Sequence, residues 1–241
     1  MNELTGKNFM VIGGSSGIGL ALVHILHRDG GAVYEASRTE APDFADADVK
    51  HLPFDITGDD FSALSQFAPE TLHGLVYCPG TITLRPFTRL TEKDFMNDFR
   101  LNVLGAVHTI QALIPSLKRG APSSVVLFST VATRVGMNFH ASVASAKSAV
   151  EGLVKSLAAE YARTAIRFNV VAPSITETPL AAQLLNTQQK TERSAKRHPL
   201  ERIGKPEDMA KAARFLVGQD AGWVTGQVLQ VDGGLSSLSL L

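Results

Sequence analysis

The sequence lacks the features that would place the protein in an oxidising compartment or a membrane. Its single cysteine, Cys78, rules out an internal disulfide and fits a reducing environment. The apolar stretch near the N-terminus is too short for a signal-peptide core, and no run approaches the roughly 18 apolar residues that span a membrane. We therefore expect a cytoplasmic protein that does not insert into a membrane.

Net charge is absent as well. The 23 basic residues are balanced by 23 acidic ones, so the composition does not favour nucleic acid or an anionic membrane as a partner. The seven histidines share no metal-ligand spacing, and we expect no metal site. No linker or repeat divides the 241 residues, and residues 1–241 are expected to form a single domain.

Short β-type runs alternate with helix-length amphipathic stretches along the whole chain. Several of the runs are uninterrupted and apolar, as at 125–128, which is typical of strands covered on both faces. This alternation predicts a parallel sheet with right-handed crossovers, whose ligands bind beyond the carboxyl ends of the strands. The predicted strands are 9–12, 32–36, 49–54, 75–78, 124–129, 166–172 and 228–231, and the predicted helices are 17–28, 59–67, 92–118, 141–163 and 206–217.

A glycine-rich turn follows the first predicted strand and runs directly into an apolar-periodic helix. Glycines allow the backbone to turn tightly and to approach a pyrophosphate. The N-terminus of the helix offers free N–H groups and a partial positive charge to the phosphates. We therefore predict a dinucleotide-binding site formed by Gly13, Ser15, Ser16, Gly17, Ile18 and Gly19.

The end of the second predicted strand indicates which dinucleotide binds. A protein that binds NAD usually has an acidic residue there, which accepts hydrogen bonds from the ribose hydroxyls. This strand instead runs into Ser37 and Arg38, which can bind a 2′-phosphate. Glu35 is the competing acidic residue, but it falls two positions too early. The sequence favours NADP(H), and the alternative is that Arg38 is an ordinary surface arginine.

The chain carries several further motifs in a fixed order. With the glycine turn they are Gly13 to Gly19, Asp55-Ile56, Asn102, Lys147, Asn169 to Pro173, and Gly226 to Gly234. Together they resemble the short-chain dehydrogenase/reductase family, and its 3-oxoacyl-carrier-protein-reductase-like members most closely. The resemblance covers essentially the whole chain. It implies a doubly wound Rossmann fold with a seven-stranded parallel sheet and helices on both faces, a homotetramer or homodimer, and hydride transfer between nicotinamide and a small carbonyl or alcohol substrate.

The resemblance also assigns residues to the cofactor. It implies that Asp55 and Ile56 flank the adenine, and that Thr176 and Thr178 lie near the nicotinamide end. Gly80 ends the segment after the fourth strand, which the family usually writes Asn-Asn-Ala-Gly and which here reads Tyr-Cys-Pro-Gly. We expect these five residues to line the cofactor site.

The family's four catalytic residues are an asparagine, a serine, a tyrosine and a lysine. Their spacing places them at Asn102, Thr130, Val143 and Lys147. In the family the asparagine holds a helix kink and a water, the serine orients the substrate oxygen, and the tyrosine exchanges the proton. The lysine, one helical turn later on the same face, binds the nicotinamide ribose and lowers the tyrosine pKa. Threonine keeps the hydroxyl, but valine cannot exchange a proton.

Loss of a positioned acid–base group costs roughly 10²–10⁴ in rate unless another group replaces it. His140 lies three residues before the vacated position and titrates in a suitable range. Lys147 acting through a water is a second candidate, and an inert role for both also stays open. Ser142 and Ser145 are expected to face away, and Cys78 is expected to be a buried, inert thiol.

Residues 178–203 resemble the family's substrate lid. They carry Lys190, Arg193, Lys196 and Arg197, which either attract an acidic substrate or carrier protein or form a solvated helix face. Two functions remain open. The first is an NADP(H)-dependent oxidoreductase whose activity is weakened or rerouted by Val143. The second is a catalytically retired NADP(H)-binding regulatory or structural partner. Non-redox chemistry on the same scaffold, such as that of a lyase or isomerase, is a third and lesser alternative.

Overall fold

The computed structural model describes residues 4–42, 44, 48–58 and 60–239. Its centre is a seven-stranded parallel sheet, as expected from the family resemblance, and the strand order is β3-β2-β1-β4-β5-β6-β7. Every strand pairs in parallel with its neighbours. The strands are β1 (Asn8–Ile12), β2 (Ala32–Ser37), β3 (Lys50–Pro53), β4 (Gly74–Tyr77), β5 (Ser123–Phe128), β6 (Ile166–Pro173) and β7 (Val228–Val231).

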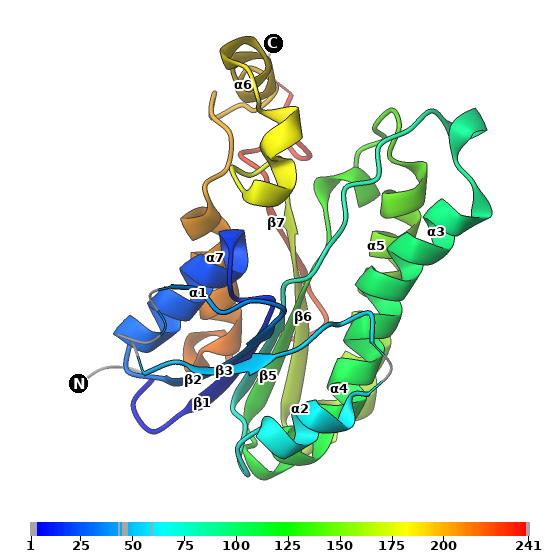
Figure 1. Ribbon diagram of the computed structural model, residues 1–241. Helices are drawn as coiled ribbons and strands as arrows, with labels where there is room; N and C mark the ends of the chain where they lie inside the picture. Colours follow the sequence, from blue (N-terminus) through cyan, green and yellow to red (C-terminus); the bar gives the residue numbers. More distant parts are fainter. Residues whose placement is uncertain (1–3, 43, 45–47, 59, 240–241) are drawn as a thin grey trace.

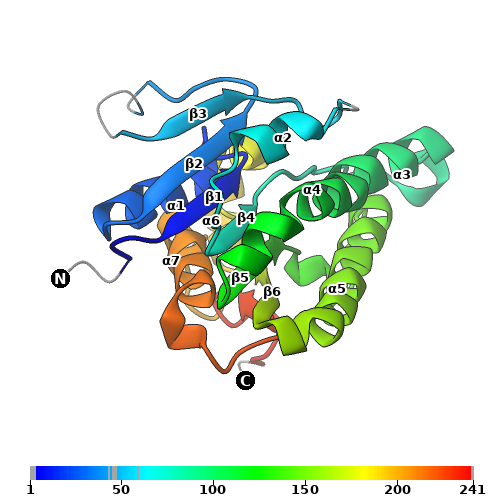
Figure 2. The same ribbon diagram turned by 90° about the horizontal axis from the view of Figure 1, so that it is seen from below.

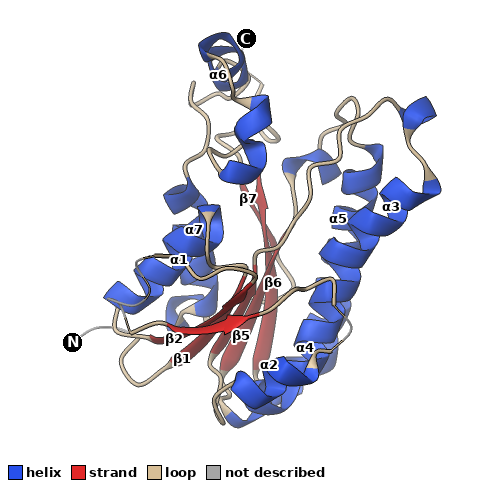
Figure 3. Cartoon of the chain, in the orientation of Figure 1, coloured by secondary structure: helices blue, strands red, loops and turns tan. Residues whose placement is uncertain are grey.

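Helices cover both faces of the sheet (Figures 1 and 2). One face carries α1 and α7, and the other carries α2, α4 and α5, with α3 continuing beyond α4. Helix α6 stands clear of the sheet (Figure 3). The helices are α1 (Gly17–Arg28), α2 (Ser62–Phe67), α3 (Glu92–Phe99), α4 (Gly105–Arg119), α5 (Ala141–Tyr161), α6 (Gln188–Ala195) and α7 (Pro206–Val217).

Alternation along the strands divides the hydrophobic core into two layers. On β1, Val11 packs in the layer under α1 and α7, whereas Met10 and Ile12 pack in the layer under α2, α4 and α5. All three side chains are almost fully buried. This burial on both faces explains why the strands are continuous apolar runs. The strand order reverses direction between β1 and β4, which is the switch point where ligands of such sheets bind.

The predicted helix 92–118 is interrupted, which the periodicity did not indicate. Residues Arg100–Leu104 form a π-helical turn between α3 and α4. Such a turn frees backbone carbonyls, and two of them find side-chain donors. Tyr77 donates its hydroxyl hydrogen to the Leu101 carbonyl at 2.5 Å, and Asn102 Nδ2 donates to the Asp98 carbonyl at 2.8 Å. The π-helical turn is therefore stabilised by the Tyr77 hydroxyl from β4 and by the side-chain amide of Asn102.

Other differences are small. The predicted helix 59–67 begins at Ser62, after an Asp60 carboxylate that accepts hydrogen bonds from the Ser62 backbone and hydroxyl; residue 59 lies outside the described residues. Helix α6 was not predicted, because its sequence carries no apolar stripe. It begins after Thr187, whose hydroxyl accepts a hydrogen bond from the Lys190 backbone N–H.

The hydroxyl of Tyr77 can be tested for its part in the π-helical turn. Tyr77→Phe leaves the Leu101 carbonyl without this donor in a buried site, and should lower the free energy of unfolding by about 1–3 kcal/mol. The measurement is urea denaturation followed by circular dichroism. Tyr161→Phe is the matched control, because the Tyr161 hydroxyl makes no hydrogen bond within the described chain, and should change stability by less than about 0.5 kcal/mol. Equal effects of the two substitutions would contradict this account.

Candidate functional site

A cleft of about 530 Å³ opens at the carboxyl ends of β1, β2 and β4. It lies at the switch point of the sheet, where the sequence predicted a dinucleotide. The structure brings twelve of the fourteen predicted cofactor residues together on its wall. They are Gly13, Ser15, Ser16, Gly17, Ile18, Gly19, Ser37, Arg38, Asp55, Ile56, Gly80 and Thr178.

The glycine turn requires glycine for two reasons. Gly13 and Gly17 have φ angles of +75° and +54°, in the left-handed region that side chains disfavour. A Cβ on Gly19 would overlap the carbonyl oxygen of Gly13, so the start of α1 packs directly against the end of β1. The Ser16 side chain forms no capping hydrogen bond at the start of α1. The first N–H groups of the helix are therefore available to an anion, which fits a pyrophosphate.

The end of β2 supplies the cationic part of the cleft. The Arg38 guanidinium forms no hydrogen bond or ion pair with any described residue, and the neighbouring Ser37 hydroxyl donates to the Thr39 carbonyl at 2.9 Å. Hydrogen bonds from the Thr57 backbone and hydroxyl lower the pKa of Asp55, and the charge of Arg38 lowers it further. An unpaired guanidinium beside a serine fits a 2′-phosphate.

Glu35 does not line the cleft. Its side chain is fully buried beneath the glycine turn, where one carboxylate oxygen accepts a hydrogen bond from the Gly14 N–H at 2.8 Å. The other oxygen lies 2.6 Å from His51 Nδ1. Burial raises the pKa of Glu35 above its ordinary value, against the opposing effect of His51. The Glu35 carboxylate thus stabilises the glycine turn from within the protein. It does not reach the cleft, so β2 supplies no acidic residue to the ribose side.

A second pocket, of about 360 Å³, adjoins the cleft and shares Ile18, Cys78, Gly80, Thr178 and Leu180 with it. This pocket is lined by the remaining predicted residues other than Asn102: Thr130, His140, Val143, Lys147 and Thr176. The two hollows together form one continuous region that can hold a dinucleotide and a small substrate side by side.

Val143 and Lys147 share one face of α5. Val143 is only 5% exposed and forms part of the apolar wall. Lys147 Nζ donates a hydrogen bond to the Phe128 carbonyl at the end of β5, at 2.8 Å. Burial lowers the pKa of Lys147 to about 8, against the opposing charges of Cys78 and Asp98. The ammonium group can therefore hold and release a proton near neutral pH.

Asn102 sits in the π-helical turn, almost fully buried and behind the pocket wall. Its Nδ2 atom donates to Thr81 Oγ1 and to the Asp98 carbonyl, both at 2.8 Å. Its Oδ1 atom has no partner within the described residues. A Cβ placed on Gly80 would lie 3.6 Å from Lys147 Nζ and 3.7 Å from Asn102 Oδ1. The lysine donor and this unsatisfied acceptor thus flank the same small space beside Gly80.

The other proton donors considered from the sequence are placed differently. His140 lines the pocket, is partly buried, and has its Nδ1 atom 2.7 Å from the Asn138 carbonyl. Burial raises the pKa of Cys78 to about 12, so the thiol is inert as a nucleophile at neutral pH. Ser142 and Ser145 do not line the pocket; Ser145 donates to the Ala141 carbonyl.

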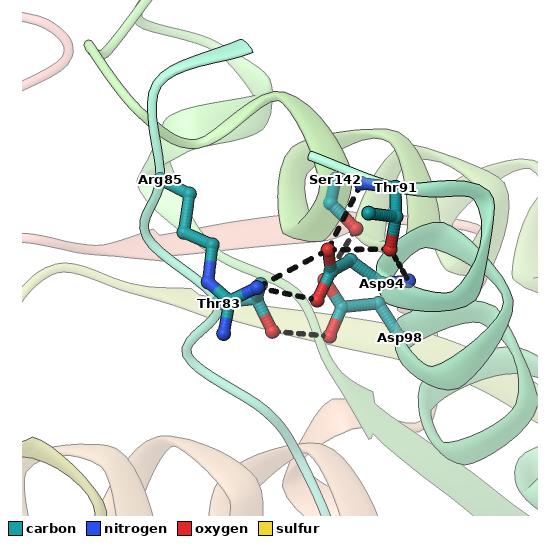
Figure 4. Close-up of polar contacts among 6 residues, drawn as sticks. All are labelled: Thr83, Arg85, Thr91, Asp94, Asp98 and Ser142. Carbon is teal, nitrogen blue, oxygen red and sulfur yellow. Dashed lines mark hydrogen bonds and ion pairs between the residues drawn. The ribbon is translucent and has the colours of Figure 1, made fainter. Parts of the chain in front are cut away.

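Sequence reasoning missed a buried carboxylate behind the site. Asp98 is 1% exposed and accepts hydrogen bonds from the hydroxyls of Ser142, at 2.6 Å, and Thr83, at 2.8 Å (Figure 4). Ser142 directly precedes Val143, so Asp98 joins the start of α5 to α3. The available signal was an aspartate inside a predicted helix, four residues before Asn102. Met137 of the pocket wall was also missed, and Arg197 was named only as one of four basic residues of the expected lid.

Two other expectations concern the described residues as a whole. None of their histidines, cysteines and carboxylates gather into a group of three that could hold a metal ion. No helix in the described part of the chain has the length and hydrophobicity needed to cross a membrane.

Comparison with known proteins gives consistent results. A family model described as enoyl-(acyl carrier protein) reductase matches residues 12–236. L-xylulose reductase from Bos taurus is 30% identical, with 96% of this chain and 97% of the relative aligned. A tropinone reductase homolog from Arabidopsis thaliana is 31% identical, with 97% and 94% aligned. The solved structure of aldohexose dehydrogenase from Thermoplasma acidophilum has a TM-score of 0.90 at 28% identity, covering 100% of this chain and 98% of that one.

The lowered pKa of Lys147 gives a pH-dependent prediction. A lysine whose pKa is about 8 in the folded state, below 10.5 in the unfolded state, makes the folded chain bind fewer protons between these values. The free energy of unfolding should therefore rise by about 2 kcal/mol between pH 7 and pH 9.5, relative to the change seen in Lys147→Met. Urea denaturation at both pH values measures this difference. Parallel pH profiles for the two proteins would contradict the lowered pKa.

Proposed function

The chain belongs to the short-chain dehydrogenase/reductase family, whose relatives here are dehydrogenases and reductases, and from this we propose that it is an NADP(H)-dependent oxidoreductase. The substrate is a small carbonyl compound or the corresponding alcohol. The observation that carries the proposal is the continuity of the glycine-turn cleft with the pocket that holds Thr130 and Lys147. Val143 makes the reaction slow or dependent on another proton donor.

NADP(H), when bound, supplies or accepts the hydride. The turn from Gly13 to Gly19 holds the pyrophosphate with the N-terminus of α1, and Ser37 and Arg38 hold the 2′-phosphate. Asp55 and Ile56 border the adenine. Lys147 binds the nicotinamide ribose, which does not require a tyrosine, and Thr176 and Thr178 border the nicotinamide end.

The pocket residues divide the remaining work. Thr130 donates a hydrogen bond to the substrate oxygen, because its hydroxyl stands where the family has a serine. Lys147 holds the proton, since its pKa of about 8 matches the working pH of a general acid. Asn102 Oδ1, which has no partner among the described residues, accepts a hydrogen bond from a water that connects it with Lys147. His140 at the pocket wall is the second candidate for the proton.

A second function is favoured by one observation. Val143 is packed into the pocket wall at 5% exposure, and the Lys147 ammonium is already engaged by the Phe128 carbonyl. Both features fit a protein that keeps NADP(H) for stability and acts as a regulatory or structural partner without turnover. This alternative requires that the protein binds NADP(H) and that no carbonyl compound causes NADPH to be oxidised.

Restoring the tyrosine separates the two functions. Val143→Tyr places a phenol one helical turn from Lys147, and should raise the rate of NADPH oxidation with carbonyl substrates by roughly 10²–10⁴. The control is Val143→Phe, which has the same ring without the hydroxyl and should not gain activity. A gain confined to Val143→Tyr supports an intact oxidoreductase site. Equal rates for both variants, with cofactor still bound, would support the retired partner.

Cofactor choice is tested at Arg38. Arg38→Gln removes the charge-assisted hydrogen bonds to the 2′-phosphate, and should weaken NADPH binding by about 10- to 100-fold while leaving NADH binding unchanged. Isothermal titration calorimetry measures both dissociation constants. Arg163→Gln, an exposed arginine remote from the cleft, is the control. Equal weakening of NADPH and NADH, or no change in either, would contradict the role of Arg38.

A further inference from the structure

The charged side chains that line the pocket beside the cofactor cleft are all positive. Its lining residues include the cationic side chains Lys147 and Arg197 and no aspartate or glutamate. Lys147 reaches it from the sheet side, where it contacts Phe128 at the end of β5. Arg197 follows α6, which stands clear of the sheet (Figure 3). The pocket therefore presents positive charge on the side of α6 as well as at the expected reaction centre.

Arg197 has no anionic partner among the described residues. The one polar contact of its guanidinium with the described residues runs from Nη2 to the Met137 sulfur at 3.9 Å, and a thioether is a weak acceptor. The other basic residues of this segment behave differently. Lys190 Nζ donates to Asn186 Oδ1 at 2.8 Å. All four basic residues are exposed, Arg197 included, but of the four only Arg197 lines the pocket. The structure thus singles out Arg197 from a basic segment that sequence alone could not divide.

Much of the remaining pocket lining is apolar. Side chains that form it include Ile82, Leu84, Met137, Leu180 and Leu184. An apolar wall lowers the local dielectric, which strengthens an ion pair formed at its rim. The planar guanidinium fork matches a carboxylate in a bidentate arrangement. The pocket volume of about 360 Å³ is suited to a small molecule.

We propose that the substrate is an oxo acid or hydroxy acid, with an apolar chain separating its carbonyl or alcohol from a carboxylate that Arg197 binds. This rests on the proposed function, because it places the reacting carbonyl beside Thr130 and Lys147. The carboxylate remains at the α6 side while the apolar chain contacts the leucines and isoleucine. Arg197 is then a specificity-determining residue, which selects acids over neutral carbonyl compounds of the same length.

The test compares binding of matched probes to the NADPH-saturated protein. The probes are oxo acids with chains of four to ten carbons, their methyl esters, and phosphate monoesters of the corresponding oxo alcohols. Dissociation constants come from quenching of NADPH fluorescence, and kcat/KM is measured in parallel. We expect at least one acid to bind about 5-fold more tightly than its ester, because Arg197 is exposed and an ion pair at an exposed arginine is screened by solvent. The preference should shrink as salt concentration rises.

Arg197→Gln should remove the preference for the acid and leave NADPH binding unchanged. Arg193→Gln, on the same segment but off the pocket, should retain it. The inference is wrong if acids and esters bind equally, if none of the acids binds, if the phosphate esters are preferred to the acids, or if both variants lose the preference alike. Failure of NADPH itself to bind would instead overturn the proposed function, so the two failures are distinguishable.

Discussion

The architecture depends on the close approach of α1 to β1. Glycine at position 19 allows the first turn of the helix to rest on the carbonyl of Gly13, and the positive φ angles of Gly13 and Gly17 turn the chain between them. No larger residue permits this contact, because a Cβ at Gly19 would overlap that carbonyl. The contact directs open backbone N–H groups toward the switch point between β1 and β4. Buried Glu35 supports the same turn through the Gly14 N–H.

The cofactor half and the chemical half of the site depend on different forces. The cleft at the glycine turn is built largely from backbone geometry and the ends of strands, and Val143 is not among its lining residues. The chemical half depends on individual side chains on α5 and the π-helical turn. There Lys147 is held by the Phe128 carbonyl and Asn102 by Thr81 and Asp98. A change of one residue can therefore alter the chemistry without dismantling the cofactor site.

Buried polar groups connect the chemical half to the fold. Asp98 joins α3 to the start of α5 through Ser142, and Tyr77 of β4 satisfies a carbonyl of the π-helical turn. Each is hydrogen-bonded in a largely apolar setting, where an unpaired polar group is costly. These contacts fix the positions of Asn102 and Lys147 relative to the sheet. Asp98, Ser142 and Tyr77 are not among the family's four catalytic positions, but their contacts help to position Asn102 and Lys147.

The sequence by itself determined the parallel sheet, most of the helices that cover it, and the glycine turn at the cleft. It could do so because burial on both faces produces apolar runs and because a tight turn restricts its positions to glycine. Tertiary structure decided the rest. The π-helical turn depends on a hydroxyl from β4, and α6 carries no apolar stripe that would have predicted it. The side-chain partners of Glu35 and Asp98 are distant in sequence, and Arg197 has no anionic partner among the described residues. Local patterns record burial and turns, whereas pairing between distant side chains exists only once the chain has folded.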